Sequence, residues 1–317
     1  LFLVLVVSVP VQAQIVNTDA LYLTVTPDYP RPFSTATVTV RSDTIDLYSS
    51  TVTITVNGVV VQTGTGVTTG TFVLGGPGTK SSIIAKITTN GFSFSKELVL
   101  VPSDVALIME PVSTAHPFYE GGPLVASEGR LRLVAVPDLR NAAGVALDPK
   151  TLVYTWRLGN KVLQTDSGIG RNILTATAPV RYRDAPITVT VTNQDQTLVA
   201  EASTLVSPVD PVVRIYRNDP LLGPDYANAL LGSANLQGTE DAFRMVPYFF
   251  SSLPAITWAV NGTVNETSNV ITLRSTGGGA GTAQVTASAQ NSATFQSANA
   301  SLSVRFGETR GLGIFGL

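Results

Sequence analysis

The chain has little capacity for side-chain chemistry, because it contains a single histidine, His116, and no cysteine. Zinc needs three or four nitrogen or sulfur ligands, so a zinc site here would require several carboxylates in their place. A Ser-His-acid triad is formally possible, but the G-x-S-x-G elbow that presents a serine nucleophile does not occur. We interpret His116 as a surface or turn histidine, since it lies in the proline-bounded segment Ala115–Phe118.

Carboxylate chemistry is also sparse. Calcium needs clustered oxygen ligands, and no D-x-[DN]-x-[DN]-G run occurs. The nearest approach to a cluster is Asn218-Asp219 with Asp225, or Glu240-Asp241, near a predicted domain junction. A carboxylate pair for glycoside hydrolysis leaves no spacing signature, so a glycoside-active enzyme stays open as a remote alternative. The sequence predicts no catalytic, cofactor-binding or metal-binding residue and a non-enzymatic protein.

The composition favours strands and weighs against nucleic acid. Charged residues make up 13% of the 317 residues, against roughly 25% in an average domain. Valine and threonine, which suit a pleated and half-buried surface, take much of their place. The net charge of −2 provides no basic field for nucleic acid or anionic lipid. Beyond the apolar run at the start of the sequence, no stretch is long and apolar enough to predict a transmembrane helix.

Three similar hexamers start at residues 53, 155 and 257, so one period of 102 residues separates them. They are Thr53–Gly58, Thr155–Asn160 and Thr257–Gly262. Each reads as a strand that runs into a tight turn, because Asn-Gly and Gly-Asn supply the positive φ that hairpin turns need. A repeat of domain size predicts three tandem domains of one kind.

A second hairpin closes each repeat, so each third contains about seven short strands with turns every 8–12 residues. The sequence therefore predicts an all-β chain of three tandem immunoglobulin-like β-sandwich domains, arranged as beads on a string. Prolines at the boundaries place the domains at residues 15–102, 103–207 and 208–306. The best helical candidate is a single turn over Tyr226–Leu231.

The two tryptophans, Trp156 and Trp258, occupy the same position in the repeat, and Ile54 holds it in the first domain. This position matches the core tryptophan of strand C in immunoglobulin-like domains. We predict that Ile54, Trp156 and Trp258 form the centres of three cores. The alternative is that the tryptophans are exposed and stack on a ligand.

Proline-rich segments with aromatic residues follow the first strand of each repeat. We interpret the prolines as breaking that strand so that it crosses between sheets and presents a blunted edge. The functional alternative is a row of aromatic contact patches, one in each domain. Those patches would contain Tyr29, Phe33, Phe118, Tyr119 and Tyr226.

The two ends of the chain depart from the repeat. Residues 1–14 predict a secretory signal peptide, with an apolar run and the cleavage site Val11-Gln12-Ala13; a buried strand is the alternative. Residues 307–317 are apolar and glycine-rich, and they fit a frayed end, a partner-docking peptide or the start of an anchor. The glycine-rich run Gly277–Gly281 lacks the lysine and helix of a phosphate loop, so we interpret it as a loop between strands.

Four further segments carry a resemblance to a known group: Thr24–Pro30, Tyr154–Arg157, Asp219–Gly223 and Val246–Phe250. With them, the chain resembles bacterial surface or secreted proteins that carry strings of immunoglobulin-like domains, above all exported proteins of reduced-genome bacteria. The resemblance covers nearly all of the chain after Gln14. It implies tandem sandwiches and an exported protein, and it implies no activity. The cysteine pair of antibody domains is missing.

These observations leave two main hypotheses for function. The first is a secreted or cell-surface structural or interaction protein, of adhesion or spacer type, whose partner is an unknown protein or glycan. The second is a glycan- or peptide-binding module that uses exposed aromatics and loops. In both cases the expected location is extracellular, at the cell surface or in the periplasm.

Overall fold

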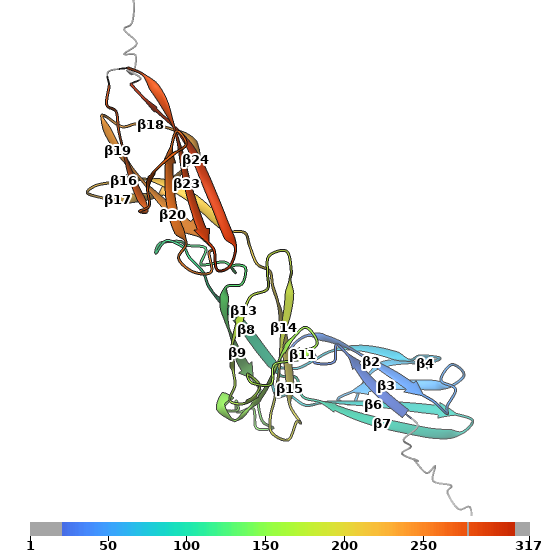
Figure 1. Ribbon diagram of the computed structural model, residues 1–317. Helices are drawn as coiled ribbons and strands as arrows, with labels where there is room; N and C mark the ends of the chain where they lie inside the picture. Colours follow the sequence, from blue (N-terminus) through green and yellow to red (C-terminus); the bar gives the residue numbers. More distant parts are fainter. Residues whose placement is uncertain (1–20, 278, 308–317) are drawn as a thin grey trace, which may run out of the picture.

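The computed structural model describes residues 21–277 and 279–307 (Figure 1). The predicted signal peptide and residues 308–317 of the tail lie outside the described residues. Within the described residues the regular structure is almost entirely β-strand, and the one helix is the 3₁₀ turn η1, Pro149–Thr151. The chain is therefore all-β, as predicted.

The first domain has seven strands in two sheets, with the orders β1-β2-β5 and β4-β3-β6-β7. All of its strand pairs are antiparallel. The strands are β1 (Leu21–Thr26), β2 (Thr35–Ser42), β3 (Thr51–Val56), β4 (Val59–Thr65), β5 (Thr69–Val73), β6 (Ser81–Thr89) and β7 (Phe92–Leu100).

The second domain repeats this plan with the orders β13-β9-β8 and β11-β10-β14-β15, and β12 lies beside β10. Its strands are β8 (Asp104–Val112), β9 (Arg130–Asp138), β10 (Val153–Leu158), β11 (Lys161–Val162), β12 (Gly168–Ile169), β13 (Ile173–Thr177), β14 (Ala185–Thr192) and β15 (Val199–Val206).

The third domain adds a hairpin and a parallel strand to the plan. Its sheets have the orders β17-β16-β19-β22 and β18-β24-β23-β20-β21, and β18 runs parallel to β24. The strands are β16 (Val212–Asp219), β17 (Gly223–Leu230), β18 (Gly232–Asn235), β19 (Glu240–Tyr248), β20 (Ala255–Val260), β21 (Thr263–Glu266), β22 (Val270–Arg274), β23 (Gly281–Asn291) and β24 (Gln296–Phe306).

Each sandwich follows from the alternation of its strands and the chemistry of its turns. In β3, Val52, Ile54 and Val56 point into the core and the threonines between them point outward. The turn after β3 places Asn57 at φ 51° and Gly58 at φ 81°, which a two-residue hairpin requires. Every sheet contains strands from one third of the chain, so the three sandwiches are tandem domains, confirming the predicted fold class.

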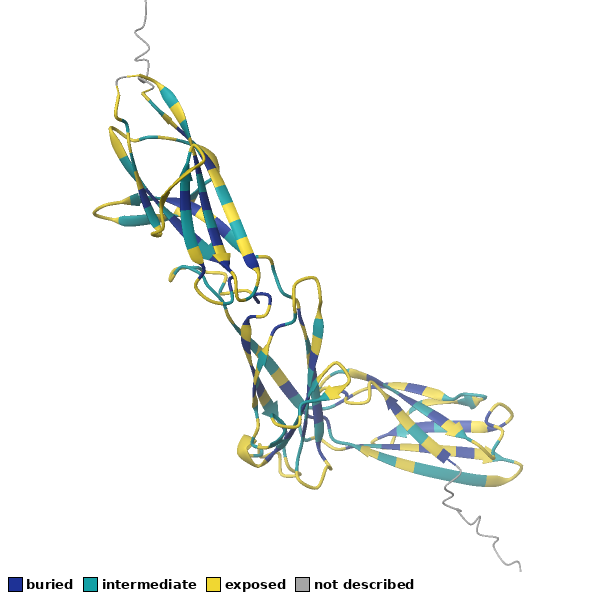
Figure 2. Ribbon diagram, viewed as in Figure 1, coloured by how far each residue is buried: buried dark blue, intermediate teal, exposed yellow. Residues whose placement is uncertain are grey.

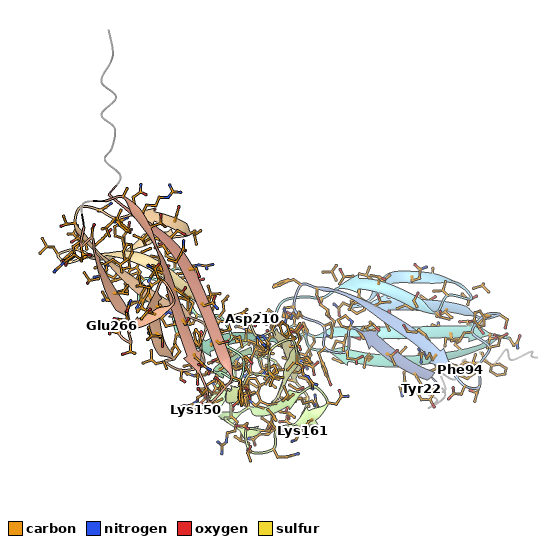
Figure 3. All side chains as sticks on the ribbon, turned by 45° about the horizontal axis from the view of Figure 1, so that its top comes forward. Tyr22, Phe94, Lys150, Lys161, Asp210 and Glu266 are labelled. Atoms are coloured by element: carbon orange, nitrogen blue, oxygen red, sulfur yellow. The ribbon has the colours of Figure 1, made fainter. Side chains whose placement is uncertain are left out.

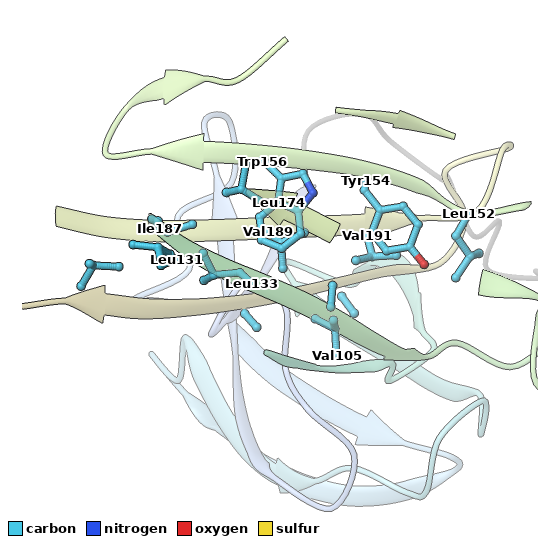
Figure 4. Packing of buried hydrophobic residues seen from close by; sticks show 14 of the residues in the cluster. Val105, Leu131, Leu133, Leu152, Tyr154, Trp156, Leu174, Ile187, Val189 and Val191 are labelled. Carbon is cyan, nitrogen blue, oxygen red and sulfur yellow. The ribbon is translucent and has the colours of Figure 1, made fainter. Parts of the chain in front are cut away.

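Three separate clusters of buried residues fill the domains (Figure 2). The structure places Ile54, Trp156 and Trp258 at 0% exposure, one in each cluster. Each indole N–H also finds an acceptor, which a buried tryptophan needs: Trp156 Nε1 donates to Arg171 O at 2.8 Å and Trp258 Nε1 donates to Ser268 O at 3.1 Å. Figure 4 shows the second core around Trp156.

The predicted helical turn over Tyr226–Leu231 is wrong. Residues 223–230 form β17, which pairs with β16 in a hairpin where Tyr216 faces Ala229. The local sequence favours a helical turn, but a single isolated turn is weak, and the hydrogen bonds to β16 outweigh that preference.

The interpretation that proline makes the first strand cross between sheets also needs correction. In the first domain, segment 27–34 joins β1 to β2 within one sheet, so the chain does not cross there. In the third domain, Pro220 lies in the β16–β17 turn, and the crossing comes later, at Leu231 between β17 and β18. These prolines lie in turns between neighbouring strands and not where the chain changes sheet.

Candidate functional site

Residues 113–129 of the second domain, which we call the docking loop, contact the third domain through hydrogen bonds and apolar packing. Its residue Thr114 pairs with the end of β19 in the third domain like a short strand. The Thr114 N–H donates to Phe250 O at 2.9 Å, and the Phe249 N–H donates to Thr114 O at 2.7 Å. The Thr114 hydroxyl accepts a further bond from the Phe250 N–H at 3.0 Å. The loop is thereby fixed to the next domain by backbone hydrogen bonds.

A second fastening lies at the other end of the docking loop. The Gln296 side chain, only 4% exposed, donates from Nε2 to Ser127 O at 3.2 Å. Its Oε1 accepts from the Ser251 N–H at 2.9 Å and from the Thr294 hydroxyl at 3.0 Å. Because a buried amide costs free energy unless its donors and acceptors are paired, this network fixes Gln296 in one orientation. Nearby, the Val209 N–H donates to Val125 O at 2.9 Å.

Between the two fastenings the docking loop covers an aromatic surface on the third domain. Tyr216, Val246 and Tyr248 point away from the core of that domain and are nevertheless buried. Ala115 and Tyr119 of the docking loop pack against them. The hydroxyls of Tyr216 and Tyr248 lie 2.7 Å apart and form a buried hydrogen bond. We call these residues, with His116, Tyr226 and Phe249, the junction cluster.

His116 lies at the centre of the junction cluster. Its ring stacks on Tyr226 with centroids 4.2 Å apart and an angle of 3° between the planes. The rings of Tyr119, Tyr216 and Tyr248 contact it edge-on at 5.8, 6.4 and 5.7 Å. These contacts join one residue of the second domain to three tyrosines of the third. The interpretation of His116 as a surface or turn histidine therefore did not include its packing against the third domain.

The surroundings of His116 do not resemble those of a catalytic base. Its Nδ1 accepts a hydrogen bond from the Phe118 N–H at 3.1 Å, which occupies the lone pair that a base would use. Among the described residues, neither a carboxylate nor a serine or threonine hydroxyl is hydrogen-bonded to the ring. The arrangement suits packing and orientation of the loop rather than proton transfer.

Burial keeps the Tyr248 hydroxyl uncharged. Removal from solvent, followed by the hydrogen bond to Tyr216, raises the pKa of Tyr248 far above its usual value. Tyr154, in the second core, behaves in the same way: burial, with a smaller contribution from Asp148, raises its pKa to about 12. At neutral pH the Tyr248 hydroxyl in the junction cluster is therefore uncharged.

A hollow of about 260 Å³ opens beside the cluster. Its wall combines aromatic faces with Arg214, an exposed arginine. The volume is close to the lower end of the range of small-molecule sites, about 300–1,000 Å³. The hollow has room for one small ring, which aromatic faces bind through apolar contact.

The structure brings three of the five predicted contact residues together at the junction cluster and leaves the other two in the first domain. Tyr119 and Tyr226 both contact His116 in the junction cluster. Phe118 is 76% exposed, with its ring 6.3 Å from that of Tyr226. Tyr29 and Phe33 lie in the first domain, where Phe33 is 72% exposed. The five aromatics thus contribute to two different places rather than to one surface.

Sequence reasoning missed the residues that hold the junction, chiefly Thr114, Gln296, Tyr216 and Tyr248. A signal for the tyrosines exists in the alternation of their strands. Ile215 points into the core, so Tyr216 must point to the outer face, where a large aromatic indicates that something covers it. Thr114 and Gln296 give no such signal, because polar residues in loops are ordinary.

The acidic residues considered for calcium are engaged in other contacts. Asp219 Oδ1 accepts from the backbone N–H groups of Leu221 and Leu222, at 2.7 and 2.9 Å. Asp241 forms an ion pair with Arg217, and Glu240 forms one with Arg274. Within residues 21–277 and 279–307, histidines and carboxylates form no group of three or more that could hold a metal ion.

The junction between the first and second domains is built with fewer contacts. An ion pair joins Arg31 Nε to Asp104 Oδ1 at 3.4 Å, with both side chains largely exposed. Gly78 lies against the second domain so closely that a Cβ there would come within 2.8 Å of Arg140 Cβ. A hollow of about 600 Å³ lies between the two domains, and its wall combines Lys80 and Val101 of the first domain with Leu147 and Asp195 of the second.

Comparison with known proteins gives structural likenesses only. The chain is similar to the three N-terminal domains of the bacteriophage RB49 Highly Immunogenic Outer Capsid protein (TM-score 0.28, 14% identity, 92% of this chain and 99% of that one). It is similar to Sidekick-1 immunoglobulin domains 1–5 (TM-score 0.30, 13% identity, 87% of this chain), of which it spans 56%. It is also similar to the ectodomain of mouse nectin-like molecule 4 (TM-score 0.28, 13% identity, 88% and 97%).

No family model matches the sequence, and no curated protein matches it. Across the described part of the chain, the structure contains no helix of the length and apolar character needed to cross a membrane. The assignment of the fold rests on the strand orders of the three domains.

Proposed function

We propose that this chain is a non-catalytic structural and interaction protein of the cell exterior, in which tandem sandwiches act as a spacer of defined shape. The docking loop is the observation that carries this proposal. Loops at the ends of sandwich domains are common binding elements. Here the corresponding loop is instead occupied in holding the next domain, through Thr114, Ser127 and the junction cluster.

Two features of the sequence support the proposed location. The predicted signal peptide of residues 1–14 favours export, and the chain resembles exported bacterial proteins with strings of immunoglobulin-like domains. The low net charge gives no attraction to nucleic acid. A bacterial origin and a role in adhesion are part of the proposal.

Solution scattering of the chain from Ile15 onward tests the spacer. The expected result is an elongated particle, and removal of the junction contacts by Thr114→Pro with Gln296→Ala broadens the distribution of shapes. Gln284→Ala, an exposed glutamine on β23, is the matched control and leaves the scattering unchanged. A compact globular envelope for the wild-type protein would contradict the proposal.

A second candidate function is glycan or peptide binding at the hollow beside the junction cluster. It is favoured by the exposed Phe118 ring next to Tyr226, since aromatic faces bind sugar rings and proline-rich segments. Glycan and peptide arrays test it, with Phe118→Ala expected to remove any binding and Phe33→Ala, in the first domain, expected to preserve it. Uniform silence of the wild-type protein on both arrays excludes this candidate.

A further inference from the structure

The three domains treat the outer edge of their last strand differently. In the third domain the edge of β24 is covered by β18, which runs parallel to it from Gly232, opposite Leu302, to Asn235, opposite Arg305. The covering continues with a hydrogen bond from the Leu236 N–H to Arg305 O at 2.8 Å. In the second domain β15 pairs with β14 alone, and a single parallel bridge joins Ala126 to Val209, beyond the end of β15.

The first domain has no corresponding covering strand among its described residues. There β7 pairs with β6 alone, and the short segment 27–34 joins β1 directly to β2, so it supplies no strand for the edge. Within residues 21–277 and 279–307, no strand pairs with the outer row of backbone donors and acceptors of this nine-residue, proline-free strand. Natural proteins seldom leave such an edge open, because it is a template for another strand.

The core beneath β7 is incompletely covered as well. The last strands of the other domains bury Ala200, Ala202 and Val206 on β15, and Leu302 and Val304 on β24. None of the nine residues of β7, all of which the structure describes, is buried. Phe94, Leu98 and Leu100 contact the first core but remain half-exposed; Figure 3 shows Phe94 at the outer end of this domain.

The third domain shows what kind of segment completes such an edge. β18 pairs through its backbone, while Ala234 and the following Leu236 pack against the third core. The missing element of the first domain is therefore an extended segment, parallel to β7, with apolar side chains at alternate positions. Addition of a strand from another chain is an established mode of peptide recognition.

The tail of this chain has that composition. Gly311–Leu317 carries no charge, and apolar side chains fall at alternate positions in either register: Leu312 and Ile314 in one, Phe315 and Leu317 in the other. Small glycines at the positions between them allow close approach of two backbones.

The tail cannot reach the first domain of its own chain. It follows β24, which ends at the opposite end of the third domain from the other two domains (Figure 1). Ten residues, 308–317, extend at most about 36 Å, roughly the length of β24 itself. A tail that binds β7 must therefore come from a second copy.

We propose that residues 311–317 of one copy add as a parallel strand to β7 of another copy, which joins the chains head to tail. Such a contact generates a closed dimer or ring where the geometry of the copies allows closure, and open chains of molecules where it does not. The proposal stands apart from the spacer function, because it uses neither the docking loop nor the junction cluster.

The test combines light scattering with hydrogen exchange on the chain from Ile15 to Leu317. The wild-type protein is expected to form concentration-dependent oligomers, with slowed exchange at those amides of residues 92–100 that point away from β6. Leu312→Asp with Ile314→Asp is expected to abolish the oligomers and restore fast exchange. Because these positions lie outside the three domains, the variant retains its fold. Thr309→Asp, which adds a charge before the apolar run, is the matched control and keeps the oligomers.

A peptide of residues 308–317 provides a second readout. Added to the Leu312→Asp, Ile314→Asp protein, it is expected to slow the same β7 amides, whereas the peptide carrying both aspartates is not. A monomeric wild-type protein with fast-exchanging β7 amides would overturn the proposal. Slow exchange at β7 in wild type and variant alike would also overturn it, since residues 15–20 or another segment would then cover the edge. Oligomers whose protected amides lie elsewhere would do the same.

Discussion

The two junctions of this molecule join similar domains by different means. Between the second and third domains, a loop of one forms backbone hydrogen bonds with the other, and an aromatic cluster is buried between them. Between the first and second domains, the contacts include an exposed ion pair, the close approach of Gly78 to Arg140 and the half-buried side chain of Val101, which packs against the second core. Buried hydrogen bonds and aromatic contacts fix geometry, whereas exposed ion pairs contribute little.

The two junctions differ because the connection between the first two strands of each domain differs in length. Residues 113–129, between β8 and β9, are long enough to reach the third domain, whereas residues 27–34, between β1 and β2, are not much longer than a turn. We infer that the second and third domains behave as one unit and that the first domain moves with more freedom. Substitutions in the cores and at each junction distinguish these two behaviours.

Replacement of the central core residues gives the largest effect. Trp258→Ala is expected to destabilise the third domain by about 3–5 kcal/mol and Ile54→Ala the first by about 2–5 kcal/mol. Through the shared junction, Trp258→Ala also lowers the unfolding midpoint of the second domain, but Ile54→Ala does not. Fluorescence of Trp156 in urea reports the second domain once Trp258, the other tryptophan, is absent, so Ile54→Ala is compared with its reference in a Trp258→Phe background. An equal shift of the Trp156 signal in both variants would contradict the comparison.

Loss of a single fastening comes next. Gln296→Ala removes a buried amide whose donor and acceptor are both engaged, so it is expected to cost about 1–3 kcal/mol. The transitions of the second and third domains separate as a result. Calorimetry measures this, with Gln284→Ala as the control for an exposed glutamine. Coincident transitions in the Gln296→Ala protein would show that this bond does not couple the domains.

Alkaline pH is expected to weaken the junction between the second and third domains. The pKa of Tyr248 is raised in the folded protein, so the unfolded chain, with a tyrosine pKa of about 10, loses its proton first. The stabilisation is thus complete below about pH 10 and declines as the pH rises above that value. Urea midpoints of the third domain between pH 8 and pH 11 test this. Tyr248→Phe is expected to give a flatter dependence, and an unchanged slope would refute the assignment.

The smallest effect is expected at the junction between the first and second domains. Arg31 and Asp104 form an exposed pair, and such pairs contribute about 0–1 kcal/mol. Arg31→Ala should therefore leave the free energy of unfolding of each domain within about 0.5 kcal/mol of its wild-type value. A cooperative loss of stability across both neighbouring domains would mean that the first junction is as well built as the second.

The sequence predicted what depends on local pattern. Alternation and the Asn-Gly turns predicted the hairpin of β3 and β4, and the tryptophans in register predicted the period of the domains. The helical turn at Tyr226 failed because the partner strand of that segment, β16, decides its conformation. Local preference is overruled there by pairing.

The junction could not be predicted in the same way. Thr114 bonds to Phe250, a residue 136 positions later, and neither residue type is unusual for its place. Such a pairing depends on how two finished domains meet, which no local pattern encodes. Tyr216 and Tyr248 are the exception, since large aromatics on the outer face of a sheet indicate a covered surface.

The most direct test of the central claim is the distribution of distances across the two junctions. The chain has no cysteine, so spin labels can be attached at Lys86→Cys, Lys161→Cys and Thr263→Cys, one exposed position in each domain. Double electron–electron resonance is predicted to give a narrow distance distribution between positions 161 and 263 and a broad one between positions 86 and 161. Distributions of equal width, or a broad one between 161 and 263, would contradict the account.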